Sequence, residues 1–119
     1  YLIERTGEVK QYRAENEEGA HTKGHNLDSV GICLAGNFDI EVPNKKQEES
    51  LISLVDKIIS RWNIKETEIY PHRHFGDTAC YGKLLSDSWA KDLYLNRKIS
   101  LIKWLIDLYN QIIIKLKEK

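Results

Sequence analysis

The clearest pattern along the chain is an apolar stripe at helical spacing between Asn44 and Asn63. Its members recur every three or four positions and fall on one face of a helix: Leu51, Leu54, Val55, Ile58, Ile59 and Trp62. Asn44 is a good N-cap, and Gln47 stands three positions later, where it can complete a capping box. The pattern predicts a helix that begins after Asn44, ends at Asn63 and covers a sheet.

Three other segments have the composition of strands. Residues 1–13 predict a hairpin of two short strands around a turn at Thr6–Gly7. The apolar run Ser29–Gly36 predicts a strand in the middle of the sheet with both faces covered, which would place Cys33 in the core. Glu66–Tyr70 predicts a further short strand that leads into Pro71 and His72. Between the first two, residues 14–28 lack apolar periodicity and predict an ordered loop.

The chain becomes helical again from Ser86, with a second stripe that contains Leu101, Leu105, Leu108, Ile112 and Leu116. Together the elements predict an α/β fold, with a mixed central sheet flanked by helices and an extended C-terminal helix. We divide the chain into a domain over residues 1–96 and an amphipathic helix over 97–119. Such a stripe packs on a core or a partner helix, and its lysines leave a membrane-surface role as an alternative.

Composition narrows the class of protein. A length of 119 residues suits one domain, and 41% hydrophobic with 30% charged residues is typical of a soluble globular chain. Eighteen basic residues balance 18 acidic ones, so no excess of positive charge favours nucleic acid as a partner. No run approaches the roughly 18 consecutive apolar residues of a membrane span. Tyr1 is not preceded by a visible leader, and two cysteines do not fix the redox compartment.

The candidate chemistry is concentrated in residues 70–82. Imidazole and thiolate are ligands that zinc prefers, and His72, His74 and Cys80 lie within this one turn-rich segment. Because a catalytic zinc normally has three protein ligands, His72 and Cys80 would fill only two positions. His74 would be a third ligand if the segment were extended; otherwise it is a solvated or hydrogen-bonding neighbour. The alternative is a surface histidine and a free thiol.

Four passages, in order, resemble the zinc-dependent N-acetylmuramoyl-L-alanine amidases of type 2, a family of phage endolysin amidases, bacterial autolysins and peptidoglycan recognition proteins. Tyr1–Val9 resembles the first hairpin of the family, and Ser29–Phe38 its central strand. Gly19–Asn26 resembles the loop "GAHTxGYN", with His25 in place of tyrosine. His72–Gly82 resembles "HRDxxxTxCPG", with histidine for aspartate at position 74 and tyrosine for proline at position 81.

The resemblance implies roles for individual residues. His72 and Cys80 would be two of three zinc ligands, and Thr78 would lie on the oxyanion side of the site. His21 and Asn26 would line the substrate groove. The implied reaction is hydrolysis of the amide between the lactyl group of muramic acid and L-alanine, with zinc polarising the carbonyl and activating water.

The same resemblance implies a gap, because the family's first zinc histidine and its catalytic tyrosine would fall before Tyr1. We therefore expect an N-terminally incomplete amidase domain that binds Zn²⁺ poorly as it stands. The implied partner is peptidoglycan, so the protein would act on the cell wall. The alternative function is a peptidoglycan-binding module without catalysis.

Overall fold

A small mixed sheet carries the N-terminal part of the molecule, of which the computed structural model describes residues 1–117, with side chains as far as Ile112. The strands are β1 (Leu2–Ile3), β2 (Val9–Lys10) and β3 (Cys33–Leu34), in the order β2-β1-β3. β1 pairs antiparallel with β2 and parallel with β3. The predicted hairpin is confirmed, and Gly7 takes the left-handed φ of +86° that its turn requires.

Two of the strand predictions are wrong. The run Ser29–Gly36 forms a ladder only at Cys33–Leu34, and β3 lies at an edge of the described sheet instead of in its middle. Cys33 is therefore exposed and not in the core, because only β1 pairs with β3 within residues 1–117. Within residues 1–117, Glu66–Tyr70 has no ladder partner, and its first half lies in a turn closed by the Glu68 N–H on the Lys65 carbonyl at 2.9 Å.

The predicted first helix is confirmed as α1 (Lys45–Trp62). Asn44 accepts from the N–H of Gln47, and the Gln47 side chain accepts from the N–H of Asn44, at 2.9 and 3.1 Å. Asn63 ends the helix in the left-handed conformation. The amide of Gln47 also donates to the Ala35 carbonyl at 2.8 Å, so the cap fastens α1 to the chain that follows β3.

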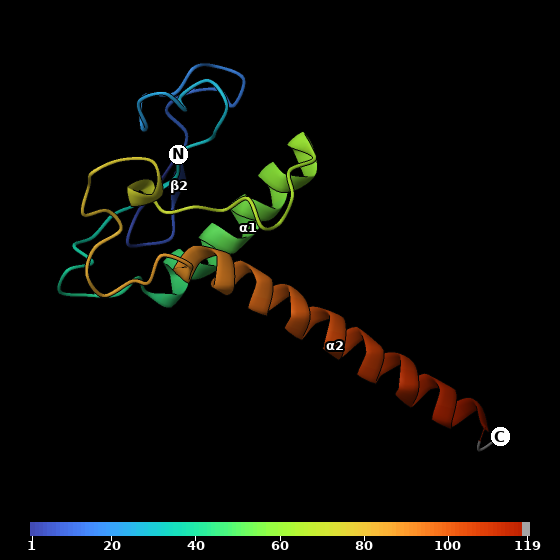
Figure 1. Ribbon diagram of the computed structural model, residues 1–119. Coiled ribbons are helices and arrows are strands. Elements are labelled where there is room, and N and C mark those ends of the chain that lie inside the picture. Colours follow the sequence, from blue (N-terminus) through green and yellow to red (C-terminus); the bar gives the residue numbers. More distant parts are fainter. Residues whose placement is uncertain (118–119) are drawn as a thin grey trace.

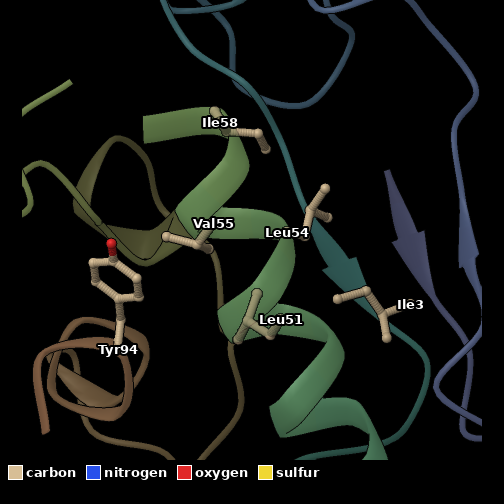
Figure 2. Close-up of a cluster of buried hydrophobic side chains, with 6 residues drawn as sticks. All are labelled: Ile3, Leu51, Leu54, Val55, Ile58 and Tyr94. Atoms are coloured by element: carbon tan, nitrogen blue, oxygen red, sulfur yellow. The ribbon is translucent and has the colours of Figure 1, made fainter. Parts of the chain in front are cut away.

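α1 lies between the sheet and the last helix, α2 (Trp89–Lys117), and the core forms along both of its contacts. Figure 2 shows Ile3 of β1 on one side of α1 and Tyr94 of α2 on the other. Ile3 is fully buried, and Tyr94 is 3% exposed with its hydroxyl donating to Asp56 at 2.8 Å. The α1 side chains of this core are Leu51, Leu54, Val55 and Ile58.

The first residue is fixed by a polar cluster around Glu15, whose side chain is 4% exposed. Its carboxylate accepts from the Tyr1 hydroxyl at 2.7 Å and from the Trp62 indole at 2.9 Å, and it pairs with Arg61. The cluster joins Tyr1, directly before β1, and the long loop to the end of α1.

The outer half of α2 leaves the body of the molecule as a straight rod (Figure 1). The radius of gyration is 17.6 Å, against about 13.5 Å for a compact chain of this length. Every residue from Ile99 to Ile112 is exposed. Within the described residues, neither helix combines the length and apolar character needed to cross a membrane. The predicted architecture, a mixed sheet with flanking helices and a long C-terminal helix, is confirmed.

Candidate functional site

The segment that holds most of the candidate chemistry is a closed loop, and Arg73 closes it. The backbone N–H of Arg73 donates to the carbonyl of Cys80 at 3.1 Å. Its guanidinium donates to the carbonyls of Gly82 and Leu85 at 3.0 and 2.6 Å, and it also pairs with Asp87. The neighbour of Arg73, His72, is thereby brought to the same end of the loop as Cys80.

The far side of this loop packs against the chain that follows β3. The N–H of Leu84 donates to the Phe38 carbonyl at 3.0 Å, and the N–H of Lys83 to the Asp39 carboxylate at 2.8 Å. Gly82 is buried with φ +120°, and a Cβ there would lie 2.5 Å from the carbonyl carbon of Phe38. Glycine is required by this close approach, which fixes the loop relative to the sheet.

His72 and Cys80 are both exposed at the surface of the loop. Although the residue is exposed, partial shielding of its thiol from water raises the pKa of Cys80, Cys33 raises it further, and Arg73 partly offsets the two. The thiol is therefore protonated at neutral pH, and a metal that binds it must displace a proton. Thr78 lies between them in sequence, and its hydroxyl oxygen accepts from the N–H of Cys80 at 3.3 Å.

His74 does not face the same way as His72, because the segment is not extended. Residues His72–His74 form the 3-10 helix η1, and the His74 ring stacks on Tyr70 with centroids 4.6 Å apart. Phe75 packs edge-on against His74 and contacts His25 at a centroid distance of 4.4 Å. The geometry places His74 in an aromatic cluster. His74 was expected to be a third zinc ligand only if the segment were extended, and that condition is not met.

The second loop of the site is built around the ring of His21. Its Nε2 lies 2.9 Å from the hydroxyl of Ser29, which itself donates to the His25 carbonyl at 2.6 Å. The ring therefore donates to Ser29, which fixes its tautomer. Cβ atoms at Gly19 and Gly31 would lie 2.4 and 2.5 Å from ring atoms, so both glycines are needed to seat it.

Burial lowers the pKa of His21, and the charges of His72 and of the chain's amino group lower it further. His21 is thus neutral at neutral pH. The two loops contact each other through the rings of His25 and Phe75, whose centroids lie 4.4 Å apart. The structure therefore brings the loop with His21 and the loop with His72 to one region of the surface.

Asn26 has a role within its own loop. Its side-chain oxygen accepts from the N–H groups of His21 and Thr22 at 2.9 and 2.8 Å, and its carbonyl accepts from Gly19 at 2.9 Å. This oxygen is used inside the molecule, which leaves the amide NH₂ as the part of Asn26 that can meet a ligand.

The donors fit zinc in kind but not in number. His72 and Cys80 supply nitrogen and sulfur, as zinc prefers. Among residues 1–117, however, no group of three or more histidine, cysteine or acidic side chains is arranged to hold a metal ion. A hollow of about 220 Å³ lies nearby, lined by Tyr70, Arg73, His74 and Lys91 among others, but neither His72 nor Cys80 lines it.

Sequence reasoning missed Arg73 and the two glycines that seat His21. Arg73 donates to main-chain carbonyls, which every residue type carries, so its partners cannot be recognised from the sequence. In the sequence, Gly19 is a loop glycine and Gly31 lies inside the predicted strand Ser29–Gly36, and their contact with His21 depends on how the loop folds back. The adjacency of Arg73 to His72 was the one available signal.

Comparison with known proteins gives consistent results. Residues 1–83 match the model of the Amidase_2 family, described as N-acetylmuramoyl-L-alanine amidase. The endolysin of Escherichia phage T7 is 29% identical over 97 residues, which cover 77% of this chain and 63% of the endolysin. Peptidoglycan-recognition protein SC2 of Drosophila melanogaster is 34% identical over 83 residues, which cover 69% of this chain and 45% of that protein.

A solved structure agrees with these sequence matches. The N-acetylmuramoyl-L-alanine amidase LysC from Clostridium intestinale URNW superposes with a TM-score of 0.72 at 30% identity. The match covers 80% of this chain and 62% of LysC. The chain thus spans less than two thirds of the length of each of these relatives.

Proposed function

The chain belongs to the Amidase_2 family of N-acetylmuramoyl-L-alanine amidases, and from this premise we propose that it contributes to zinc-dependent hydrolysis of the amide between N-acetylmuramic acid and L-alanine in peptidoglycan. The observation that supports the proposal is the Arg73-closed loop, which holds His72 and Cys80 at one end and contacts the loop of His21 through Phe75 and His25. The site of action would be the cell wall, as in lysis by an endolysin or remodelling by an autolysin.

His72 and Cys80 are the residues that would hold zinc. The ion, when bound, would supply a Lewis acid and an activated water. Each of the other residues has a task that its own contacts support. Thr78 accepts the N–H of Cys80, so its hydroxyl proton is free to donate toward an oxyanion. The seated, neutral ring of His21 and the amide NH₂ of Asn26 would contact the glycan-peptide substrate.

The number of candidate zinc ligands limits how well the chain alone could bind zinc. Two protein ligands are fewer than the three of a catalytic zinc, so we propose that this chain binds zinc weakly and hydrolyses slowly unless another ligand is supplied. That ligand would be a histidine in sequence upstream of Tyr1. A peptidoglycan-binding module without catalysis is the second candidate function, and the two-donor set is the observation that favours it.

Cobalt is a suitable probe for the metal, because a thiolate bound to Co²⁺ gives a charge-transfer absorption that imidazole alone does not. We would titrate Co²⁺ and Zn²⁺ into the 119-residue chain and into a form extended upstream, with Cys80→Ser and Cys33→Ser variants of each. The expected result is tight, stoichiometric binding in the longer form only, lost in Cys80→Ser and kept in Cys33→Ser. A thiolate band that depends on Cys33 and not on Cys80 would contradict the assignment.

Activity is tested separately, by release of new L-alanine amino groups from purified peptidoglycan. Hydrolysis by the extended form, and its loss in His72→Ala, would support the amidase. Sedimentation with insoluble peptidoglycan, without release of amino groups in either form, would favour the binding module. Full activity of the 119-residue chain would contradict the proposed ligand deficit.

A further inference from the structure

The outer half of α2 presents an apolar surface that nothing within the described residues covers. Between Ile99 and Ile112, nine large apolar side chains are 40 to 63% exposed. At 1.5 Å per residue this part of the helix is about 20 Å long. A continuous apolar surface of this length is a liability for a soluble chain and marks a contact site.

The apolar positions have the spacing of a coiled-coil seam. Four of them follow one another at intervals of four, three and four residues, which are the a and d positions of a heptad: Leu101, Leu105, Leu108 and Ile112. Counting back one heptad from Leu101 gives Tyr94, which is 3% exposed and packs in the core with α1. The face of α2 that packs against a helix within the body therefore continues, uncovered, along the rod.

The residues beside the seam widen the apolar face. Ile102, Trp104 and Tyr109 flank it and are 51, 58 and 63% exposed. Ser100, Lys103, Asp107, Asn110 and Gln111 occupy the opposite side, so the apolar arc covers roughly 220° of the helix at 100° per residue. Such an arc is wider than the stripe of about 100° with which a helix covers one core.

Charge along the exposed part of α2 does not favour a lipid surface as the occupant. A helix that lies on a membrane normally carries lysine and arginine along its polar face. From Ile99 to Ile112 the charged residues are Lys103 and Asp107, which cancel, and further basic residues of α2 lie only beyond the two ends of this stretch, the nearest being Arg97, Lys98, Lys115 and Lys117. Anionic headgroups would find basic partners at the ends of the rod and not along it, and heptad spacing is not something a lipid surface requires.

The seam is complementary to itself. When two copies of the rod are set antiparallel, Leu101 lies opposite Ile112 and Leu105 opposite Leu108, and two-fold symmetry repeats both layers. The body of each chain lies at the N-terminal end of α2, so this arrangement puts the two bodies at opposite ends (Figure 1). We propose that the outer half of α2 is a homodimerisation surface that pairs with α2 of a second copy of this chain.

The test is the mass of the 119-residue chain by light scattering across a hundredfold range of concentration. We expect twice the 13.9 kDa of one chain. The double variant Leu105→Glu/Leu108→Glu puts charges into the seam and should have the mass of one chain. The matched control, Ser100→Glu/Asn110→Glu, adds the same charge on the polar side and should keep the doubled mass.

A folding control separates lost pairing from lost structure. Since Leu105 and Leu108 are exposed in the single chain, both double variants should show an unaltered thermal unfolding midpoint of the body at concentrations where all are monomeric. A monomeric parent chain, or a seam variant that keeps the doubled mass, would overturn the proposal. Binding of the monomer to phosphatidylcholine or phosphatidylglycerol vesicles, without self-association, would overturn it in favour of a lipid surface. The result is independent of metal binding and hydrolysis.

Discussion

The guanidinium of Arg73 donates to the carbonyl oxygen of Gly82 at 3.0 Å, across the mouth of the loop that holds His72 and Cys80. A second hydrogen bond, to the Leu85 carbonyl, and the ion pair with Asp87 use the other two nitrogens of the guanidinium. The geometry suits arginine and not lysine, because only a planar guanidinium presents several donors in fixed directions. The loop therefore depends on one side chain that itself supplies no candidate metal ligand.

We predict that Arg73→Lys and Arg73→Ala both lower the free energy of unfolding, by about 1–3 kcal/mol, because main-chain carbonyls lose their donors. The alanine variant should lose more. Chemical denaturation measures the change. Arg13→Ala is the control, since Arg13 also donates to a main-chain carbonyl, that of Glu18 at 2.9 Å, but in an exposed loop. Its effect should stay within about 0.5 kcal/mol. Equal losses at the two arginines would contradict the role of Arg73 in closing the loop.

A methyl group at Gly31 should displace the ring of His21. The Cβ would lie 2.5 Å from Cγ of His21, so Gly31→Ala should destabilise the fold by about 1–3 kcal/mol and shift the His21 signals in NMR spectra. Gly76→Ala is the control, because no atom lies within 4 Å of a Cβ there. The double variant His21→Ala/Gly31→Ala should recover part of the loss. If it recovers nothing, the clash is not with the imidazole.

Local signals in the sequence were sufficient for the elements that need no distant partner. The N-cap Asn44, the C-cap Asn63 and the glycine of the hairpin each impose their conformation through their own side chain or lack of one. β3 and residues 66–70 were mispredicted because a strand exists only where another strand pairs with it, and pairing is not encoded in the segment itself. The composition of each segment alone therefore overstated the extent of strand in both.

In the candidate site, too, the features set by local sequence could be predicted and those set by distant contacts could not. His72, Thr78 and Cys80 could be proposed from their spacing in one segment, and the structure keeps them in one loop. The orientation of His74 could not be predicted from the sequence, because it depends on a single turn of 3-10 helix and on stacking with Tyr70. The seating of His21 depends on glycines 2 and 10 positions away in sequence.

Gln47 should be the most costly polar residue of α1 to replace. It is 2% exposed, completes the capping box and donates to the Ala35 carbonyl. Gln47→Ala would leave that carbonyl without its donor and should lower the free energy of unfolding by about 1–3 kcal/mol. Glu49→Ala, an exposed site on the same helix, should change it by less than about 0.5 kcal/mol. Urea denaturation of the two variants checks the difference, and equal effects would rule out the role of the cap.

Glu15 should make stability depend on pH in the acid range. Burial by itself would raise the pKa of this carboxyl, but hydrogen bonds from Tyr1 and Trp62 and the charge of Arg61 outweigh burial and lower the pKa. Because the pKa is lower in the folded state, the stabilisation is complete above the pKa of an unfolded glutamate and is lost as pH falls through the folded value. Glu15→Gln should therefore be less stable than the parent at pH 7, and the difference should shrink on acidification.

Unfolding measured from pH 7 to pH 3 tests this, with Glu17→Gln as the exposed control. A gap between Glu15→Gln and the parent that stays constant over this range would show that the ionised carboxylate does not stabilise the fold.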